Sequence, residues 1–387
     1  MAITSPIGEE PLMEAPRTAI LRRPIPWGLL GMLTLIWGVE GLIDHRIGPL
    51  YSLLASDWAM TAEAVGRETL NRDLLCLGDS QIKLGVQPIT IENRSGIRSY
   101  NLALNRGLPS SSEFLLRKAL AAGARPRAIV LGASPGLLAA SPRLNGLLWP
   151  ELVGLGEILD ISWTARDPRP ALQAISSRLL PSNNAREEIR FSIVAALRGD
   201  SNDSIDRTSQ FRRNWQANLG AQAHPKNLGF LDLDLDVPDD PATGGRPVSW
   251  RPRPENVAHL RRLLRLAAEH DIRVYWLAPG FSPAAQARRE RNGLDAAYTR
   301  FLDALRSEFP SLIVLDGRRL GLDASFYIDP VHLDHEGAEI LSAFVAKALI
   351  RTLERNEAPP NGWIDLATLA DSATENLADR PRGERSR

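Results

Sequence analysis

The sequence alternates short apolar segments with longer amphipathic ones, and this alternation is what most constrains its fold. The apolar segments have the length of buried strands and lie at 73–78, 98–104, 127–132, 273–279 and 311–317. The amphipathic segments place apolar residues at helical spacing and lie at 110–123, 253–271, 296–309 and 335–353. Strands that are apolar throughout and alternate with helices indicate a parallel sheet covered on both faces. We therefore predict an α/β fold, a three-layer α/β/α flavodoxin-like domain with a five-stranded parallel sheet.

This alternation is interrupted once and flanked by segments of a different character. We interpret 71–352 as the domain and about 140–250 as a helical insertion between its third and fourth strands, where insertions commonly shape a site. Ahead of the domain, 44–70 mixes short apolar runs with helix formers, and we predict a stalk. Behind it, the composition of 353–387 predicts a flexible C-terminal tail.

An apolar segment at 25–43 carries one charge, Glu40, near its end. Its length is close to the ~20 residues that cross a bilayer as a helix. Arginines precede it, so the positive-inside rule leaves 1–24 as a cytoplasmic tail and the rest of the chain outside. We predict a single-pass membrane protein with an extracytoplasmic domain. A buried core helix and a cleaved signal peptide are the alternatives.

Composition narrows the class of partner and of site. The chain of 387 residues has 46 basic and 46 acidic residues, so no basic excess argues for a nucleic-acid partner. The single cysteine, Cys76, excludes an internal disulfide framework and a cysteine-based zinc cluster. We expect Cys76 to be a small core residue of the first strand. His224, His259 and His270 lie in polar segments, and we expect them to be solvated.

Candidate chemistry lies where the strands end, because ligands of a doubly wound sheet bind beyond the carboxyl ends of its strands. The first strand runs into Gly78, Asp79 and Ser80, and the segment after the fifth strand contains Asp329 and His332. A serine hydroxyl becomes a nucleophile when a base accepts its proton, and the base needs a third group to hold its tautomer. With the Asp329 carboxylate on one ring nitrogen, the other nitrogen of His332 would face Ser80.

The order of these motifs resembles the SGNH/GDSL hydrolase family. The resemblance rests on LGDS at 77–80, YNLALNRG at 100–107, a third-strand block ending in GASP at 132–135, and DPVH at 329–332 before the last helix. It covers about 71–128 and 270–350 of the chain. What it implies is an ester-cleaving mechanism without a cofactor or metal, in which Ser80 is the nucleophile, His332 the base and Asp329 its partner.

The resemblance also implies an oxyanion hole with three donors: the serine N–H, a glycine N–H of the second block and an asparagine side chain of the third. Gly107 is the nearest glycine in the second block, but Arg106 stands in the expected place. Ser134 stands where the asparagine is expected, and Ser134 or Asn105 is the candidate to replace it. Losing one such donor costs roughly 10²–10³ in rate, so we expect a slow, altered or redirected activity. Arg106 is either a surface residue or a group that holds an anionic or sugar substrate.

We therefore predict a membrane-anchored serine esterase that acts on acyl esters, acetyl esters first, of a carbohydrate or lipid. The alternative is an O-acyltransferase that modifies an exported polysaccharide together with membrane-bound acyl-transfer machinery, as the family's membrane-anchored relatives suggest. A non-catalytic binding or assembly protein on the same fold is the rival from another class. Two further interpretations stay open: a Gly-Asp-Ser turn without function, and a metal cluster of His332, His335, Asp329 and Asp334. Asp334 is also placed to cap the last helix.

Overall fold

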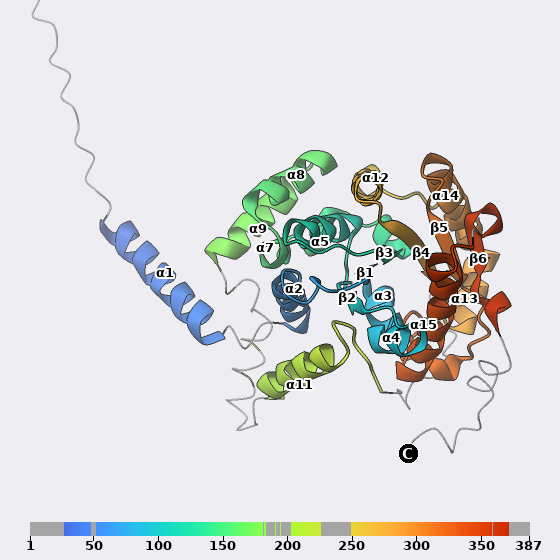
Figure 1. The fold of residues 1–387 in the computed structure, drawn as a ribbon. Coiled ribbons are helices and arrows are strands. Elements are labelled where there is room, and N and C mark those ends of the chain that lie inside the picture. Colours follow the sequence, from blue (N-terminus) through green and yellow to red (C-terminus); the bar gives the residue numbers. More distant parts are fainter. Residues whose placement is uncertain are drawn as a thin grey trace, which may run out of the picture.

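A parallel sheet of six strands in the order β2-β1-β3-β4-β5-β6 forms the centre of the molecule (Figure 1). The computed structural model describes residues 27–47, 52–180, 203–225, 249–357 and 359–370, together with Ser182, Arg190 and Val194. The strands are β1 (Leu74–Gly78), β2 (Ser99–Asn101), β3 (Ala128–Gly132), β4 (Arg273–Pro279), β5 (Ile313–Gly317) and β6 (Trp363–Asp365). The predicted α/β fold with a flavodoxin-like parallel sheet is confirmed. The strand order reverses between β1 and β3, where a ligand crevice is expected.

The sixth strand corrects the predicted five-stranded sheet. β6 pairs with β5 and comes from the segment predicted to be a flexible tail, 353–387. The tail prediction is therefore wrong for 359–370, whereas 371–387 lie outside the described residues. A strand of three residues is too short to produce a periodic pattern, and the burial of Ile364 and Leu366 arises only from packing.

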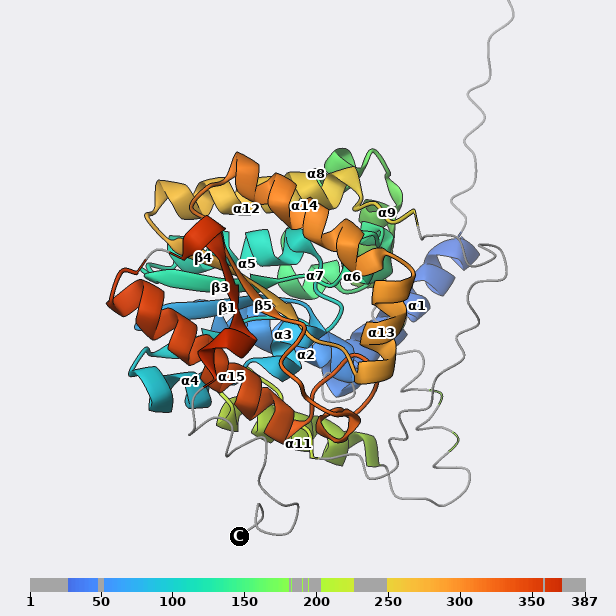
Figure 2. The ribbon, with the colours of Figure 1, turned by 90° about the vertical axis from the view of Figure 1, so that its right-hand side faces the viewer.

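Helices cover both faces of the sheet (Figures 1 and 2). On one face lie α5 (Pro109–Ala121), α12 (Pro254–Glu269) and α14 (Leu294–Glu308), and on the other α3 (Ser80–Gly85), α4 (Pro88–Ser95) and α15 (His335–Leu349). The shorter elements are α13 (Pro283–Arg291), η4 (Ala324–Phe326), η5 (Ile350–Glu354), η6 (Pro360–Gly362) and η7 (Leu366–Leu369). Within β1, Leu75 and Leu77 belong to one apolar cluster and Leu74 and Cys76 to the other. Because both faces are buried, the strands are apolar throughout. Cys76 is the expected core residue, and burial raises its pKa to about 12.

Of the predicted stalk, 44–70, residues 44–47 belong to helix α1 (Trp27–Ile47) and 48–51 lie outside the described residues, whereas the segment 52–70 is instead part of the body. Its helix α2 (Leu53–Ala64) buries Trp58 completely, and the Trp58 ring meets Trp149 edge to face with 5.2 Å between ring centroids. The sequence hides this role because the apolar run in the helix is short and is broken by Asp57, whose carboxylate is also buried. The helix neighbours of α2 are α7 (Trp149–Leu152) and α11 (Asp203–Ala217).

The segment between β3 and β4 contains several helices joined by turns and loops in the part that the structure describes. Besides α7, α11 and α12 it contains α6 (Pro135–Leu138), η2 (Pro142–Asn145), α8 (Leu155–Ala165) and α9 (Arg169–Leu179). The irregular part of the predicted insertion, 226–248, lies outside the described residues. The helices α7, α8 and α9 group at one end of the molecule in Figure 1.

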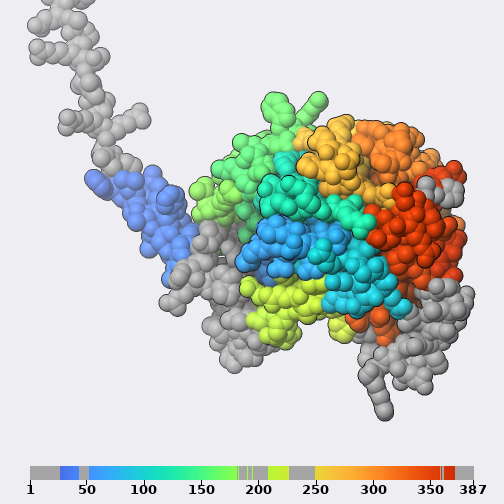
Figure 3. Space-filling model, viewed as in Figure 1, coloured from blue at the N-terminus to red at the C-terminus, as the bar shows by residue number. Residues whose placement is uncertain are grey.

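Helix α1 (Trp27–Ile47) projects from the body (Figure 3). The carboxylate of Glu40 accepts hydrogen bonds from the N–H of Ser182 at 2.9 Å and from its hydroxyl at 2.6 Å. In the part of the chain that the structure describes, no helix combines the length and the apolar character needed to span a bilayer. The predicted cytoplasmic tail, 1–24, lies outside that part.

Candidate active site

Three side chains from distant motifs form an unbroken hydrogen-bonded chain at the carboxyl edge of the sheet. The Ser80 hydroxyl oxygen lies 2.8 Å from Nε2 of His332. Nδ1 of the same ring lies 2.7 Å from Oδ2 of Asp329. The fold thus brings the three predicted residues together across a sequence separation of 252. Hydroxyl, imidazole and carboxylate stand in the order that nucleophilic catalysis requires.

The end of β1 places Ser80. Ser80 is the first residue of α3, and the helix is capped by Asp79, whose Oδ1 accepts a hydrogen bond from the Gln81 N–H at 3.0 Å. Gly78 has a φ of +143°, and a Cβ there would lie 2.1 Å from the carbonyl oxygen of Gly132. The close approach of two backbones therefore requires glycine at this turn. The backbone N–H of Ser80 has no acceptor among the described residues. It is therefore free to donate a hydrogen bond to an oxyanion.

Asp79 also links the first motif to the third. Its carboxylate is buried, and Oδ2 accepts a hydrogen bond from the Ser134 N–H at 2.7 Å. Burial raises the pKa of Asp79, while hydrogen bonds from the N–H and the hydroxyl of Ser134 oppose that shift. The Ser134 N–H is thus directed at Asp79, and its hydroxyl oxygen accepts a hydrogen bond from the Leu137 N–H at 3.4 Å. That Ser134 replaces the missing asparagine stays a prediction.

The loop that carries His332 is held by its own carboxylate. Oδ1 of Asp329 accepts hydrogen bonds from the N–H groups of Val331 at 2.8 Å and His332 at 2.9 Å. Nε2 of Gln81 donates to the carbonyl of Val331 at 3.3 Å, which ties the loop to α3. Burial acts to raise the pKa of Asp329, but the His332 ring and these N–H groups outweigh it and hold the pKa below its usual value of 3.8. Asp329 therefore stays ionised opposite the imidazole.

This depressed pKa predicts a pH-dependent contribution to stability. A carboxyl group whose pKa is lower in the folded state stabilises the fold above its unfolded pKa, and this stabilisation is lost as the pH falls through the folded value. We expect Asp329→Asn to be less stable than the wild type at about pH 7, with the difference shrinking towards about pH 3. Urea denaturation of both proteins at each pH measures it. A difference in unfolding free energy that is the same at both pH values would contradict the assignment.

The second block forms a tight turn, in which the backbone N–H of Arg106 is free and that of Gly107 is not. The Gly107 N–H donates to the carbonyl of Leu104 at 2.8 Å, so it is not available as the expected oxyanion donor. Gly107 is required for space, since a Cβ there would lie 2.3 Å from the Gly78 carbonyl oxygen. Arg106 has a φ of +60°, the left-handed conformation that glycine favours. The backbone N–H of Arg106 finds no acceptor within the described part of the chain and is the better oxyanion candidate.

Asn105 is held by Asp57 of α2. Its backbone N–H and its side-chain Nδ2 both donate to Oδ2 of Asp57, at 2.9 and 3.0 Å. Asn105 is therefore a link to α2, and the expectation that it replaces the third oxyanion donor stays a prediction. The side chain of Arg106 is exposed, which fits the predicted surface residue. The alternative, an exposed guanidinium that meets the substrate, stays a prediction.

Of the three histidines predicted to be solvated, His270 is exposed as expected, whereas His259 and His224 are wholly or partly buried. His259 is buried, with Nδ1 2.5 Å from Oε2 of Glu113. His224 is half-buried, and its carbonyl accepts a hydrogen bond from the His335 N–H at 2.9 Å. Burial lowers the pKa of His224, the nearby ring of His332 lowers it further, and Asp329 acts in the opposite direction. His224 thus lies beside the triad, a placement that its polar sequence context did not signal.

The four residues of the alternative metal cluster form hydrogen bonds with different partners. His332 and Asp329 bind each other. Nδ1 of His335 lies 3.0 Å from Nε2 of Gln87, and Asp334 caps α15 as predicted, with Oδ1 accepting from the N–H that follows at position 337. Among the described residues, no group of three or more histidine, cysteine, aspartate or glutamate side chains is arranged to hold a metal ion.

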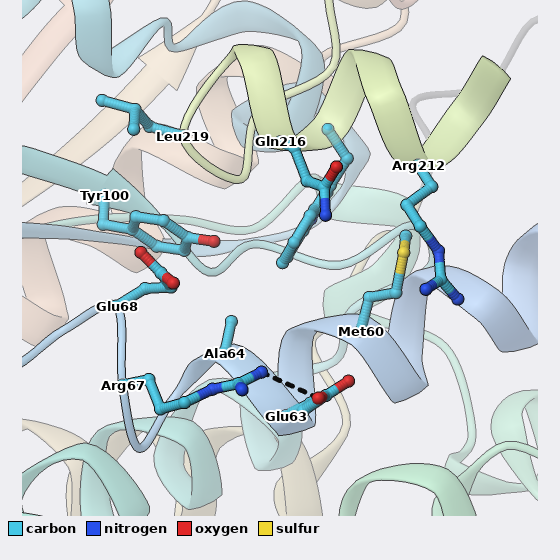
Figure 4. Close-up of a pocket in the computed structure, with 10 residues that line it drawn as sticks. Met60, Glu63, Ala64, Arg67, Glu68, Tyr100, Arg212, Gln216 and Leu219 are labelled. Carbon is cyan, nitrogen blue, oxygen red and sulfur yellow. Dashed lines mark hydrogen bonds and ion pairs between the residues drawn. The ribbon is translucent and has the colours of Figure 1, made fainter. Parts of the chain in front are cut away.

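A separate hollow of about 240 Å³ lies between α2, α11 and the edge strand β2 (Figure 4). Tyr100 lines it from β2, and the stick view shows Met60 of α2 and Arg212 of α11 on its walls. At its rim, Glu63 and Arg67 form an ion pair at 2.7 Å, and both side chains are largely exposed. The hollow contains no residue of the hydrogen-bonded chain, so we assign it no part in the chemistry.

No protein-family model matches the sequence, and no curated protein matches it. What bears on the function is therefore the site itself: the order of its motifs, their places at the strand ends and the contacts between their side chains.

Proposed function

We propose that the protein is an SGNH-type serine esterase that cleaves acyl esters. The observation that supports this most is the hydrogen-bonded chain from the Ser80 hydroxyl through both nitrogens of His332 to Asp329. A turn or a helix cap needs neither the imidazole nor the second carboxylate. The conjunction of all three at the carboxyl edge, next to the strand-order reversal, is what a catalytic site requires.

The proposed first half-reaction forms an acyl-serine. Ser80 Oγ attacks the ester carbonyl carbon while His332 Nε2 accepts the hydroxyl proton. Asp329 holds Nδ1–H and stabilises the imidazolium. The negative charge on the carbonyl oxygen is met by the backbone N–H groups of Ser80 and Arg106. Collapse of the tetrahedral intermediate breaks the C–O bond, and His332 returns the proton to the leaving alcohol.

The second half-reaction decides between hydrolysis and transfer. Water, or the hydroxyl of a carbohydrate or lipid, loses a proton to His332 and attacks the carbonyl carbon of the acyl-serine. The bond between that carbon and Ser80 Oγ then breaks, His332 returns the proton to Ser80 Oγ, and the free acid or the new ester leaves. The side chains of His332 and Asp329 remain 23% and 43% exposed, so the site is open to an acceptor larger than water. This openness fits an ester carried on a carbohydrate or lipid, with acetyl as the first acyl group to test.

The proposal is tested on the full-length protein with a series of p-nitrophenyl esters from acetate to octanoate and with a fluorophosphonate probe. We expect release of p-nitrophenol, fastest for the short acyl chains, and a covalent adduct that mass spectrometry maps to Ser80. Adding a sugar acceptor to the acetate reaction separates the two outcomes, because an acetylated sugar appears only if transfer competes with water. A protein with neither turnover nor a label on Ser80 would leave only the non-catalytic role.

We also propose that α1 attaches the protein to a membrane, leaving the active site outside the cytoplasm. The support is the exposure of its apolar side chains, with Trp27 74%, Leu35 68% and Trp37 67% exposed. Such side chains favour a lipid environment over water. Fractionation of cells that express the full chain tests this. We expect the protein in the membrane pellet and its release by detergent but not by high salt, and recovery in the soluble fraction would exclude it.

A further inference from the structure

The turn at Leu104–Gly107 has one backbone N–H that the fold leaves without a partner. Leu104 donates to the carbonyl of Gly78, Asn105 to Asp57, and Gly107 back to Leu104. Within the described residues, only the Arg106 N–H of this turn lacks an acceptor. The turn also abuts the end of β1, since its first residue bonds Gly78, two positions before the nucleophile.

The direction of that N–H is set by the other end of the same peptide group. The peptide between Asn105 and Arg106 carries the Asn105 carbonyl and the Arg106 N–H, and in a planar trans peptide these two groups point in opposite directions. Nε1 of Trp58 donates a hydrogen bond to the Asn105 carbonyl at 3.0 Å. The carbonyl is therefore held towards α2, and the Arg106 N–H is turned away from α2.

A buried ion pair fixes α2 in this place. Oδ1 of Asp57 lies 2.7 Å from Nζ of Lys83, and both side chains are fully buried. Lys83 belongs to α3, one helical turn after Ser80, whereas Oδ2 of Asp57 holds Asn105. Breaking a buried pair of this kind is strongly unfavourable, because it leaves a charge without compensation. Helix α2 is thus connected to both the nucleophile helix and the turn.

We infer that Trp58 is a positioning residue for the proposed reaction: its indole N–H holds the Asn105–Arg106 peptide so that the Arg106 N–H can receive the oxyanion. The inference rests on the proposed function. It explains why a non-glycine residue is held at a positive φ beside the site, since the strain of that conformation is offset by three hydrogen bonds between α2 and Asn105, one donated by Trp58 and two accepted by Asp57.

The test replaces only the indole N–H. Trp58→Phe keeps an aromatic ring in the core but frees the Asn105 carbonyl. The matched control is Trp276→Phe: Trp276 is also fully buried, and its Nε1 donates one hydrogen bond, to the Tyr298 hydroxyl at 2.9 Å. Both variants should lose similar thermal stability. Only Trp58→Phe should lower kcat, by ~10-fold or more, with KM nearly unchanged, because an oxyanion donor acts in the transition state.

A transition-state analogue supplies a readout that lost packing alone would not move. Phenylboronic acid forms a tetrahedral adduct with a catalytic serine, so its inhibition constant should weaken in Trp58→Phe by about the same factor as kcat/KM and stay unchanged in Trp276→Phe. Trp58→Tyr, which also lacks the indole N–H, replaces Trp58→Phe if the latter does not fold, and the same loss is expected. Equal kcat in the Trp58 and Trp276 variants would overturn the inference while the esterase proposal stands. A wild type without turnover or Ser80 labelling would instead remove the proposed function itself.

Discussion

Alanine at position 80 is expected to reduce ester hydrolysis by at least ~10³-fold, to the level that the oxyanion donors and binding alone support. The Ser80 hydroxyl is the atom that would form the acyl intermediate, and its partner in the fold is Nε2 of His332 at 2.8 Å. Among the described residues, Ser80 is the one whose hydroxyl forms a hydrogen bond with Nε2 of His332. Steady-state kinetics with p-nitrophenyl acetate and the fluorophosphonate label both report the loss.

Stability and specificity controls accompany this variant. Ser80 is only half-buried and its side chain is small, so the thermal midpoint of Ser80→Ala should match that of the wild type. Ser325→Ala, in the turn that precedes the Asp329 loop, should retain both turnover and label. The double variant Ser80→Ala/His332→Ala should be no slower than Ser80→Ala, since the residues act as a unit. Full activity in Ser80→Ala, or independent losses that multiply in the double variant, would refute the triad.

Gly78→Ala is expected to destabilise the protein by roughly 3 kcal/mol or more and to abolish turnover with it. The residue has a φ of +143°, and the new Cβ would meet the Gly132 carbonyl oxygen at 2.1 Å and the Ile82 side chain at 2.9 Å. The first contact cannot be relieved by a side-chain movement, because it is with the backbone of the neighbouring strand β3. β1 must then shift, and Ser80 shifts with it.

The matched control for this change is Gly136→Ala in α6, where a Cβ meets nothing within 4 Å. Alanine is a good helix former, so this variant should be as stable as the wild type or slightly more so. Urea denaturation compares the two variants, and the p-nitrophenyl ester assay at low temperature shows whether folded Gly78→Ala retains activity. A Gly78→Ala protein as stable as Gly136→Ala would show that the strands do not need this close approach.

The sequence by itself determined the sheet and the chemistry-bearing motifs. The five predicted strands all appear, within a few residues of their expected bounds, because strands buried on both faces must be apolar throughout. The same logic located Ser80 and His332, since parallel strands deliver whatever follows them to one edge. Asp329 and the cap at Asp334 followed from local spacing, which a short loop preserves.

Only the tertiary structure decided what surrounds that chemistry. The burial of Asp57, its pair with Lys83 and the hold of Trp58 on Asn105 join segments about 25 to 50 residues apart through contacts that no periodicity encodes. The backbone N–H that is left free belongs to Arg106 and not to Gly107, because the folded turn decides which N–H group reaches a carbonyl. The pairing of β6 with β5 and the place of His224 near His332 and Asp329 also depend on tertiary packing, because no local sequence pattern specifies them.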